Sequence, residues 1–73
     1  MENLRDISEI VNVDPNREIV LIFTSGGSIC GHTNGIIDEN DGEFQSLYLQ
    51  TETLGIDVHV EYIVLWAYTD EIF

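Results

Sequence analysis

Residues 58–69 have the sequence VHVEYIVLWAYT, and this stretch decides the fold class. From Val58 onward, apolar and aromatic side chains occupy every second position, which is the period of a β-strand. Beyond Glu61-Tyr62 the opposite parity, starting at Ile63, also becomes apolar. This change predicts two short strands divided by a bend, with the core-facing side switching there.

Three further strands are predicted upstream. They have the sequences IVLIFT at 19–24, SICGHT at 28–33 and FQSLYLQ at 44–50. The first is a continuous β-branched and aromatic run, which is typical of a strand covered on both faces. The third alternates apolar and polar side chains. With the two strands of 58–69, the chain is predicted to contain five strands.

Turn residues separate these strands. SGGS at 25–28 predicts a hairpin turn, and Asn34-Gly35 predicts either a tight turn or a glycine bend within one long strand. Residues 38–42, DENDG, are predicted to form a loop, and residues 51–57 another connection. Five strands at this spacing favour a small antiparallel barrel over residues 18–69.

The first segment, residues 1–13, is predicted to be a short helix. Leu4, Ile7, Ile10 and Val11 follow the spacing of one apolar helical stripe, and DPN at 14–16 ends it. With only 73 residues, the chain is expected to form one domain comprising this helix and the barrel.

This pattern resembles an Sm-like or SH3-like small β-barrel. The resemblance consists of an N-terminal helix, five strands, Gly26 and Gly31 across the first two strands, an aspartate after strand two and a terminal bend. It implies the barrel fold and strand-mediated oligomers. It does not extend to RNA binding, because the expected basic residue is absent: Val60-Glu61-Tyr62-Ile63 stands where the family's second motif would lie.

Charge is the strongest functional indication. The formal net charge is −12, and residues 18–73 contain no lysine or arginine. Such a surface repels phosphate backbones and attracts cationic partners, so direct nucleic-acid binding is not expected. No segment has the length of a membrane span or the form of a signal peptide, and a cytoplasmic protein is expected.

No enzyme, metal or cofactor is predicted. Cys30 is the only cysteine, so no internal disulfide can form. Cys30, His32 and His59 are too few for a zinc site unless carboxylates complete the set, and no base and oxyanion hole accompany the cysteine. DENDGE at 38–43 is rich in oxygen ligands, but its register does not match a calcium-binding EF-hand. SGGS lacks the lysine and helix of a phosphate-binding loop.

The sequence therefore predicts a non-enzymatic acidic module that binds a protein, most plausibly a basic one, through its carboxylates or through an exposed apolar strand or aromatic C-terminus. One form of this hypothesis is a nucleic-acid mimic or inhibitor. The alternatives are an Sm-like homo-oligomer that binds a nucleotide or RNA fragment, and a structural subunit. The predicted partner-binding residues are Asp38, Glu39, Asp41, Glu43, Glu61 and Trp66.

Overall fold

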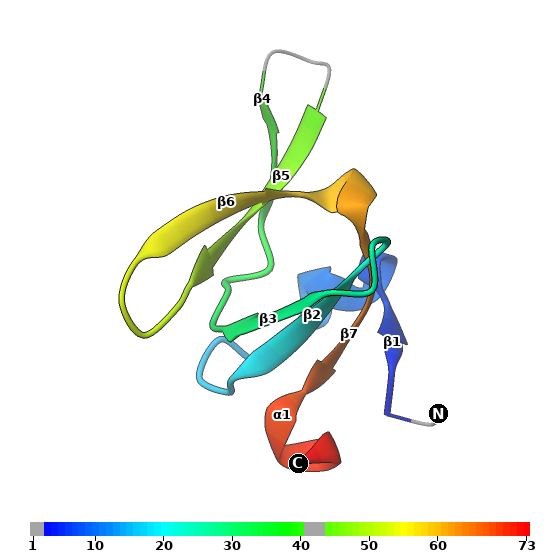
Figure 1. Cartoon of the computed structure of the whole chain (residues 1–73). Coiled ribbons are helices and arrows are strands. Elements are labelled where there is room, and N and C mark those ends of the chain that lie inside the picture. The colour runs from blue at the N-terminus through cyan, green and yellow to red at the C-terminus, as the bar shows by residue number, and fades with distance from the viewer. Residues whose placement is uncertain (1–2, 41–43) are drawn as a thin grey trace.

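The computed structural model describes residues 3–40 and 44–73, and it is mostly β (Figure 1). The strands are β1 (Arg5–Asp6), β2 (Ile19–Phe23), β3 (Ser28–Gly31), β4 (Ile37–Asn40), β5 (Phe44–Gln50), β6 (Gly55–His59) and β7 (Ile63–Tyr68). The helices are two 3₁₀ helices, η1 (Ile7–Asn12) and η2 (Val60–Tyr62), and the short α-helix α1 (Thr69–Ile72).

The strands form two antiparallel sheets. One has the order β1-β7-β2-β3 and the other the order β4-β5-β6. Among the described residues, one isolated bridge joins the sheets, between His32, which follows β3, and Gln50 at the end of β5. The prediction of an antiparallel, mostly β fold is confirmed. The five-stranded barrel is wrong, because the described residues form seven strands in two sheets that do not close.

The strands predicted upstream lie close to where the sequence placed them. β2, β3 and β5 match the runs at 19–24, 28–33 and 44–50, with β3 ending earlier. The predicted bend is also confirmed, because the 3₁₀ helix η2 separates β6 from β7 at residues 60–62. In β7, odd and even positions both contribute buried side chains. Ile63 and Trp66 are buried, whereas Val64 is 43% exposed.

The helix predicted over residues 1–13 is only partly confirmed, because residues 1–2 lie outside the described part of the chain and only residues 7–12 are helical, as a 3₁₀ helix. Arg5 and Asp6 instead pair with β7, and the chain then forms the 3₁₀ helix η1, whose N-cap Asp6 accepts a hydrogen bond from the Ser8 N–H. A 3₁₀ helix has three residues per turn, so Ile7, Ile10 and Val13 align on one face. These three contact the core, whereas Val11 is 62% exposed.

The loop predicted at residues 38–42 is also partly wrong. Residues 37–40 form β4, in which Asp38 pairs with Ser46 and Glu39 with Gln45. The half-buried Ile37 packs against the core and anchors the strand. The two acids are accommodated because β4 is an edge strand, where exposed charges limit unwanted strand pairing.

The core lies where the two sheets face η1. Its largest fully buried side chains are Ile10, Ile19, Leu21, Leu47, Leu49 and Trp66. The Trp66 indole N–H donates to the Asp6 carbonyl oxygen at 3.1 Å, so burial leaves this donor satisfied. The Tyr68 hydroxyl likewise accepts from the Asp14 N–H at 2.9 Å. These two bonds fasten the N-terminal segment to β7.

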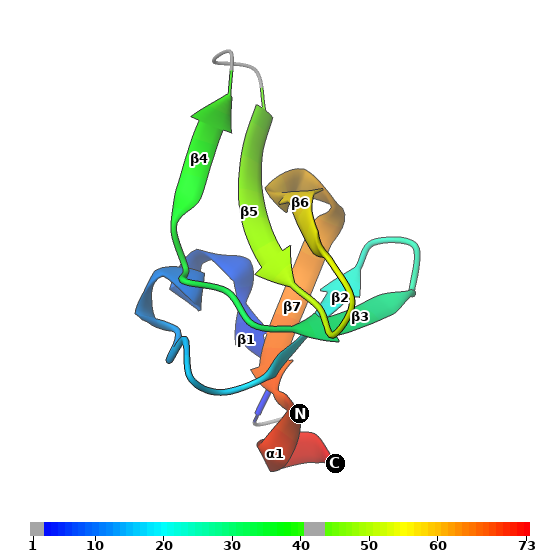
Figure 2. The same ribbon diagram turned by 90° about the vertical axis from the view of Figure 1, so that its left-hand side faces the viewer.

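The fold is elongated, with principal extents of 36 × 25 × 23 Å. The β4–β5 hairpin projects at one end, and α1 lies at the other (Figures 1 and 2). Neither the 3₁₀ helices nor α1, in the part of the chain that the structure describes, has the length and apolar character needed to cross a membrane.

Candidate acidic groove

Both arginines lie at the α1 end and are bound by its acids. Arg17 forms a two-pronged contact with Asp70, with its Nη2 2.6 Å from Oδ1 and its Nε 3.2 Å from Oδ2. Arg5 pairs with Glu71 at 3.0 Å. Arg17 also lies 3.6 Å from the centroid of the Tyr68 ring, a cation–π contact. The chain's cationic side chains are thus gathered at this end.

The acids elsewhere are left without an arginine. Every aspartate and glutamate among the described residues is exposed to solvent. Hydrogen bonding also affects the titration of some of them. The hydrogen bond from Arg17 lowers the pKa of Asp70, and the Ser8 hydroxyl and N–H lower the pKa of Asp6. Away from α1 the surface is consequently negative.

Four of the six predicted partner-binding residues, Asp38, Glu39, Glu61 and Trp66, lie among the described residues. Asp38 and Glu39 are exposed on β4, and the Glu39 carboxylate accepts from the Gln45 amide at 3.1 Å. Glu61 is exposed on η2, with its Oε1 3.9 Å from His59 Nδ1. Trp66 is only 1% exposed, so it belongs to the core and presents no surface to a partner. Asp41 and Glu43 lie outside the described residues.

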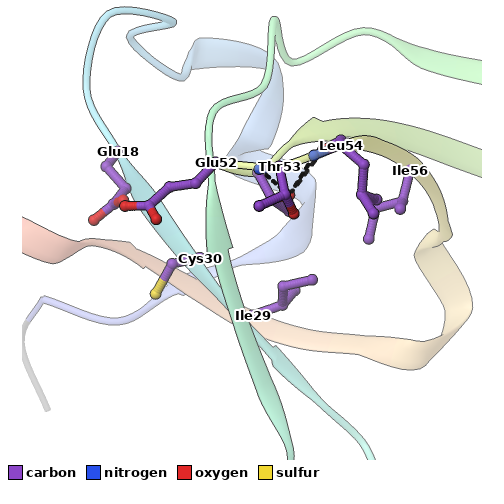
Figure 3. A pocket seen from close by; sticks show the side chains of 8 residues that line it. Glu18, Ile29, Cys30, Glu52, Thr53, Leu54 and Ile56 are labelled. Carbon is purple, nitrogen blue, oxygen red and sulfur yellow. Dashed lines mark hydrogen bonds between the residues drawn. The ribbon is translucent and has the colours of Figure 1, made fainter.

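A groove of about 490 Å³ lies between β3 and the turn that joins β5 to β6 (Figure 3). Its lining combines apolar and acidic side chains, chiefly those of Glu18, Ile29, Cys30, Glu52, Leu54 and Ile56. Its volume is within the range of roughly 300–1,000 Å³ that is common for ligand-binding clefts. None of the residues that line it is among the partner-binding residues predicted from the sequence.

The apolar side chains that line the groove are partly exposed to solvent. Leu54 is 52% exposed, and Ile29 and Ile56 are half-buried at the margin of the core. The turn that carries Leu54 is held by Thr51, whose hydroxyl accepts from the N–H groups of Thr53 and Leu54 and donates to the Leu54 carbonyl. One wall of the groove is therefore an ordered turn.

Two glutamates form the acidic part. Glu18 precedes β2, and its carboxylate accepts one hydrogen bond from the Thr69 hydroxyl at 2.9 Å. Glu52 has no hydrogen bond or ion pair within the described residues, and Figure 3 shows its side chain directed toward the Glu18 end of the groove. Neither carboxylate has a cationic partner, so both are available to an external cation.

Cys30 is exposed in the same groove. Partial burial of the sulfur raises the pKa of the Cys30 thiol although the residue as a whole is exposed, and the negative charge of Glu18 raises it further. A raised pKa keeps the thiol protonated and makes it a poor nucleophile. Over residues 3–40 and 44–73, no group of three or more His, Cys, Asp or Glu side chains is placed to hold a metal ion.

Comparison of the chain with protein-family models, with curated proteins and with solved structures finds no match. The charge distribution and the groove are therefore the features of the molecule that bear on its function.

Proposed function

We propose that this chain is a non-enzymatic acidic interaction module that binds a basic segment of another protein. The observation that carries the proposal is the separation of charge: Arg5 and Arg17 are bound by Asp70 and Glu71 at one end, and the other carboxylates of the described residues are exposed and have no arginine partner. A net charge of −12 on so small a protein attracts cationic partners over long range and speeds their association.

A pull-down with a charge-neutralised variant tests the proposal. The wild-type chain and the variant D38N/E39Q/E52Q/E61Q are immobilised and exposed to nuclease-treated lysate of the host, then washed at low and high salt. We expect a basic protein on the wild type that high salt releases and that the variant fails to retain. Equal retention by both chains at high salt would contradict a charge-driven contact. Urea unfolding of both chains controls for loss of fold.

A nucleic-acid mimic is one specific form of this module. Asp38 and Glu39 lie on the projecting β4–β5 hairpin, and Asp41 and Glu43 fall between those strands in the sequence. In a mimic these acids stand in for phosphates, so DNA or RNA competes with the chain for its partner. Neutralising all four should lower both the association rate and its salt dependence. A partner that nucleic acid does not displace would contradict mimicry.

The second proposal is an Sm-like homo-oligomer that binds a nucleotide or RNA fragment. It is supported by the exposed edge strands β4 and β6, and by a second hollow of about 270 Å³ beside Tyr48, Asn34 and Gln50. An aromatic ring and amide side chains suit a planar base. Light scattering and titration with nucleotides test this second proposal. A monomer that binds no nucleotide would contradict it. A structural subunit would show neither self-association nor nucleotide binding.

A further inference from the structure

The outer edge of β3 is only partly paired. β3 pairs with β2 on one side, and at its end the N–H and carbonyl of His32 bond to Gln50 at 2.9 and 2.8 Å on the other. Backbone polar groups of an antiparallel strand point to alternate sides with a period of two residues. Ser28 and Cys30 therefore present their N–H and carbonyl groups to the same side as His32, away from β2.

No strand within residues 3–40 and 44–73 pairs with Ser28 and Cys30 on that side. The pairing between β3 and β5 is limited to His32 and Gln50, because the chain turns at Thr51 into β6. Both Ser28 and Cys30 are exposed. The outer edge of β3 therefore has one bridge, at His32, while the backbone N–H and carbonyl groups of Cys30 and Ser28 have no strand partner there among the described residues.

The acidic groove wraps this same edge. Ile29 and Cys30 are consecutive in β3, so their side chains project from opposite faces of the sheet, yet both line the groove (Figure 3). A hollow that reaches both faces must pass over the strand edge. It is bounded on its far side by the β5–β6 turn, where Leu54 and Glu52 lie.

We propose that an extended, basic segment of the partner adds as a strand to the edge of β3, continuing the bridge between His32 and Gln50. Its backbone pairs with Ser28 and Cys30. Its apolar side chains contact Ile29 and Ile56, and a lysine or arginine reaches Glu18 and Glu52. The inference rests on the function proposed above and specifies where and how the basic partner binds.

Charge excludes a second copy of this chain as the occupant. Pairing two β3 edges would bring two sets of Glu18 and Glu52 together without a cation, and like charges at such a contact are unfavourable. Residues 18–73 contain no lysine or arginine to relieve this repulsion. Arg5 and Arg17 are already bound at the α1 end. The cation must come from another protein.

The test uses defined peptides in place of the unidentified partner. The probe is a capped eight-residue peptide in which lysine and valine alternate, and its control is a peptide of the same composition with the lysines in one block. We expect the alternating peptide to bind at low salt and to slow hydrogen exchange at the amides of Ser28 and Cys30, measured by NMR. The amides of β4, an edge strand of the other sheet, should be unaffected.

Two comparisons separate strand addition from simple charge attraction. In an added strand, every second peptide N–H faces β3 and the others face away. N-methylation of the amides that face β3 should weaken binding by about tenfold, and N-methylation of the other amides should weaken it much less. E18Q/E52Q should weaken binding by about tenfold, and D38N/E39Q, which removes the same charge, by clearly less.

The outcomes distinguish the two proposals. If both peptides bind equally, with salt dependence but without protection of β3, the acidic module stands and strand addition is overturned. Equal effects of the two methylation patterns would overturn it as well. If neither cationic peptide binds at low salt, the function proposed above fails together with this inference.

Discussion

The backbone of Gly31 crosses that of Gln50 so closely that a Cβ atom at Gly31 would lie 2.6 Å from the Gln50 carbonyl oxygen. It would also lie 2.9 Å from Cγ of Leu49, a fully buried residue. The neighbouring bridge between His32 and Gln50 joins the two sheets at this point. The absence of a side chain at Gly31 therefore allows the two sheets to come this close, and it thereby fixes the position of the β5–β6 turn next to β3.

Replacing Gly31 with alanine should destabilise the protein by roughly 1–3 kcal/mol, because the added methyl group meets backbone and core atoms that have little room to move. The measurement is the free energy of unfolding in urea. Gly27 is the matched control, since a Cβ there would meet its nearest atom, Ser25 Oγ, at 3.7 Å. Comparable losses in G31A and G27A would contradict the close crossing.

The Arg17–Asp70 contact should make stability depend on pH. The hydrogen bond from Arg17 lowers the pKa of Asp70 in the folded state, so its contribution is present above the unfolded pKa of about 3.9 and is lost as pH falls through the lower, folded value. We expect D70N to unfold at a lower temperature than the wild type near neutral pH, with the difference vanishing in strong acid.

The control for this experiment is D57N. Asp57 is exposed on β6 and makes no hydrogen bond or ion pair within the described residues. Removing the same charge there should leave the melting temperature near neutral pH unchanged or slightly higher. A melting curve of D70N that follows that of D57N across the pH range would show that the Arg17 contact does not stabilise the fold.

Cys30 should react slowly with iodoacetamide. The thiolate is the reactive form, and burial together with the charge of Glu18 raises the pKa of this thiol. At a fixed pH near neutral, the alkylation rate should be below that of a free cysteine peptide, and E18Q should raise it. E61Q, which removes an acid outside the groove, serves as control. Identical rates for E18Q and the wild type would place Glu18 away from the sulfur.

Trp66 should contribute to stability through both packing and its hydrogen bond. It is 1% exposed, and its indole N–H bonds to the Asp6 carbonyl. W66F removes that donor and leaves a cavity, which should cost about 2–3 kcal/mol in the free energy of unfolding measured by far-UV circular dichroism. Tyr62, 55% exposed, is the control. Equal stability of W66F and Y62F would argue against the buried position.

Salt should stabilise the protein. Its exposed carboxylates repel one another, and screening reduces this repulsion as the Debye length falls from about 30 Å at ~0.01 M salt to about 3 Å at ~1 M. The urea midpoint should rise over this range, because repulsion among many acids outweighs the weakening of the exposed Arg5 and Arg17 pairs. A midpoint that stays constant or falls would contradict this prediction.

The strands that the sequence predicted have a local signal. The continuous apolar run of β2 and the parity change at Glu61-Tyr62 are properties of adjacent residues, and the structure confirms both. The spacing of Ile7 and Ile10 was misinterpreted because i, i+3 spacing suits an α-helix and a 3₁₀ helix alike. β4 was missed because its pairing to β5 stabilises a sequence, DEN, that by itself favours a loop.

The acidic character of the surface and the antiparallel, mostly β class follow from the sequence alone, because net charge and hydrophobic period need no knowledge of which segments meet. Where the charges act depends on the tertiary structure. Glu18 and Glu52 are far apart in the sequence, and they line one groove because β3 and β5 cross at Gly31. The same crossing ends the pairing between β3 and β5 at His32 and Gln50, so one edge of β3 stays open. Such contacts depend on long-range packing, which no local pattern encodes.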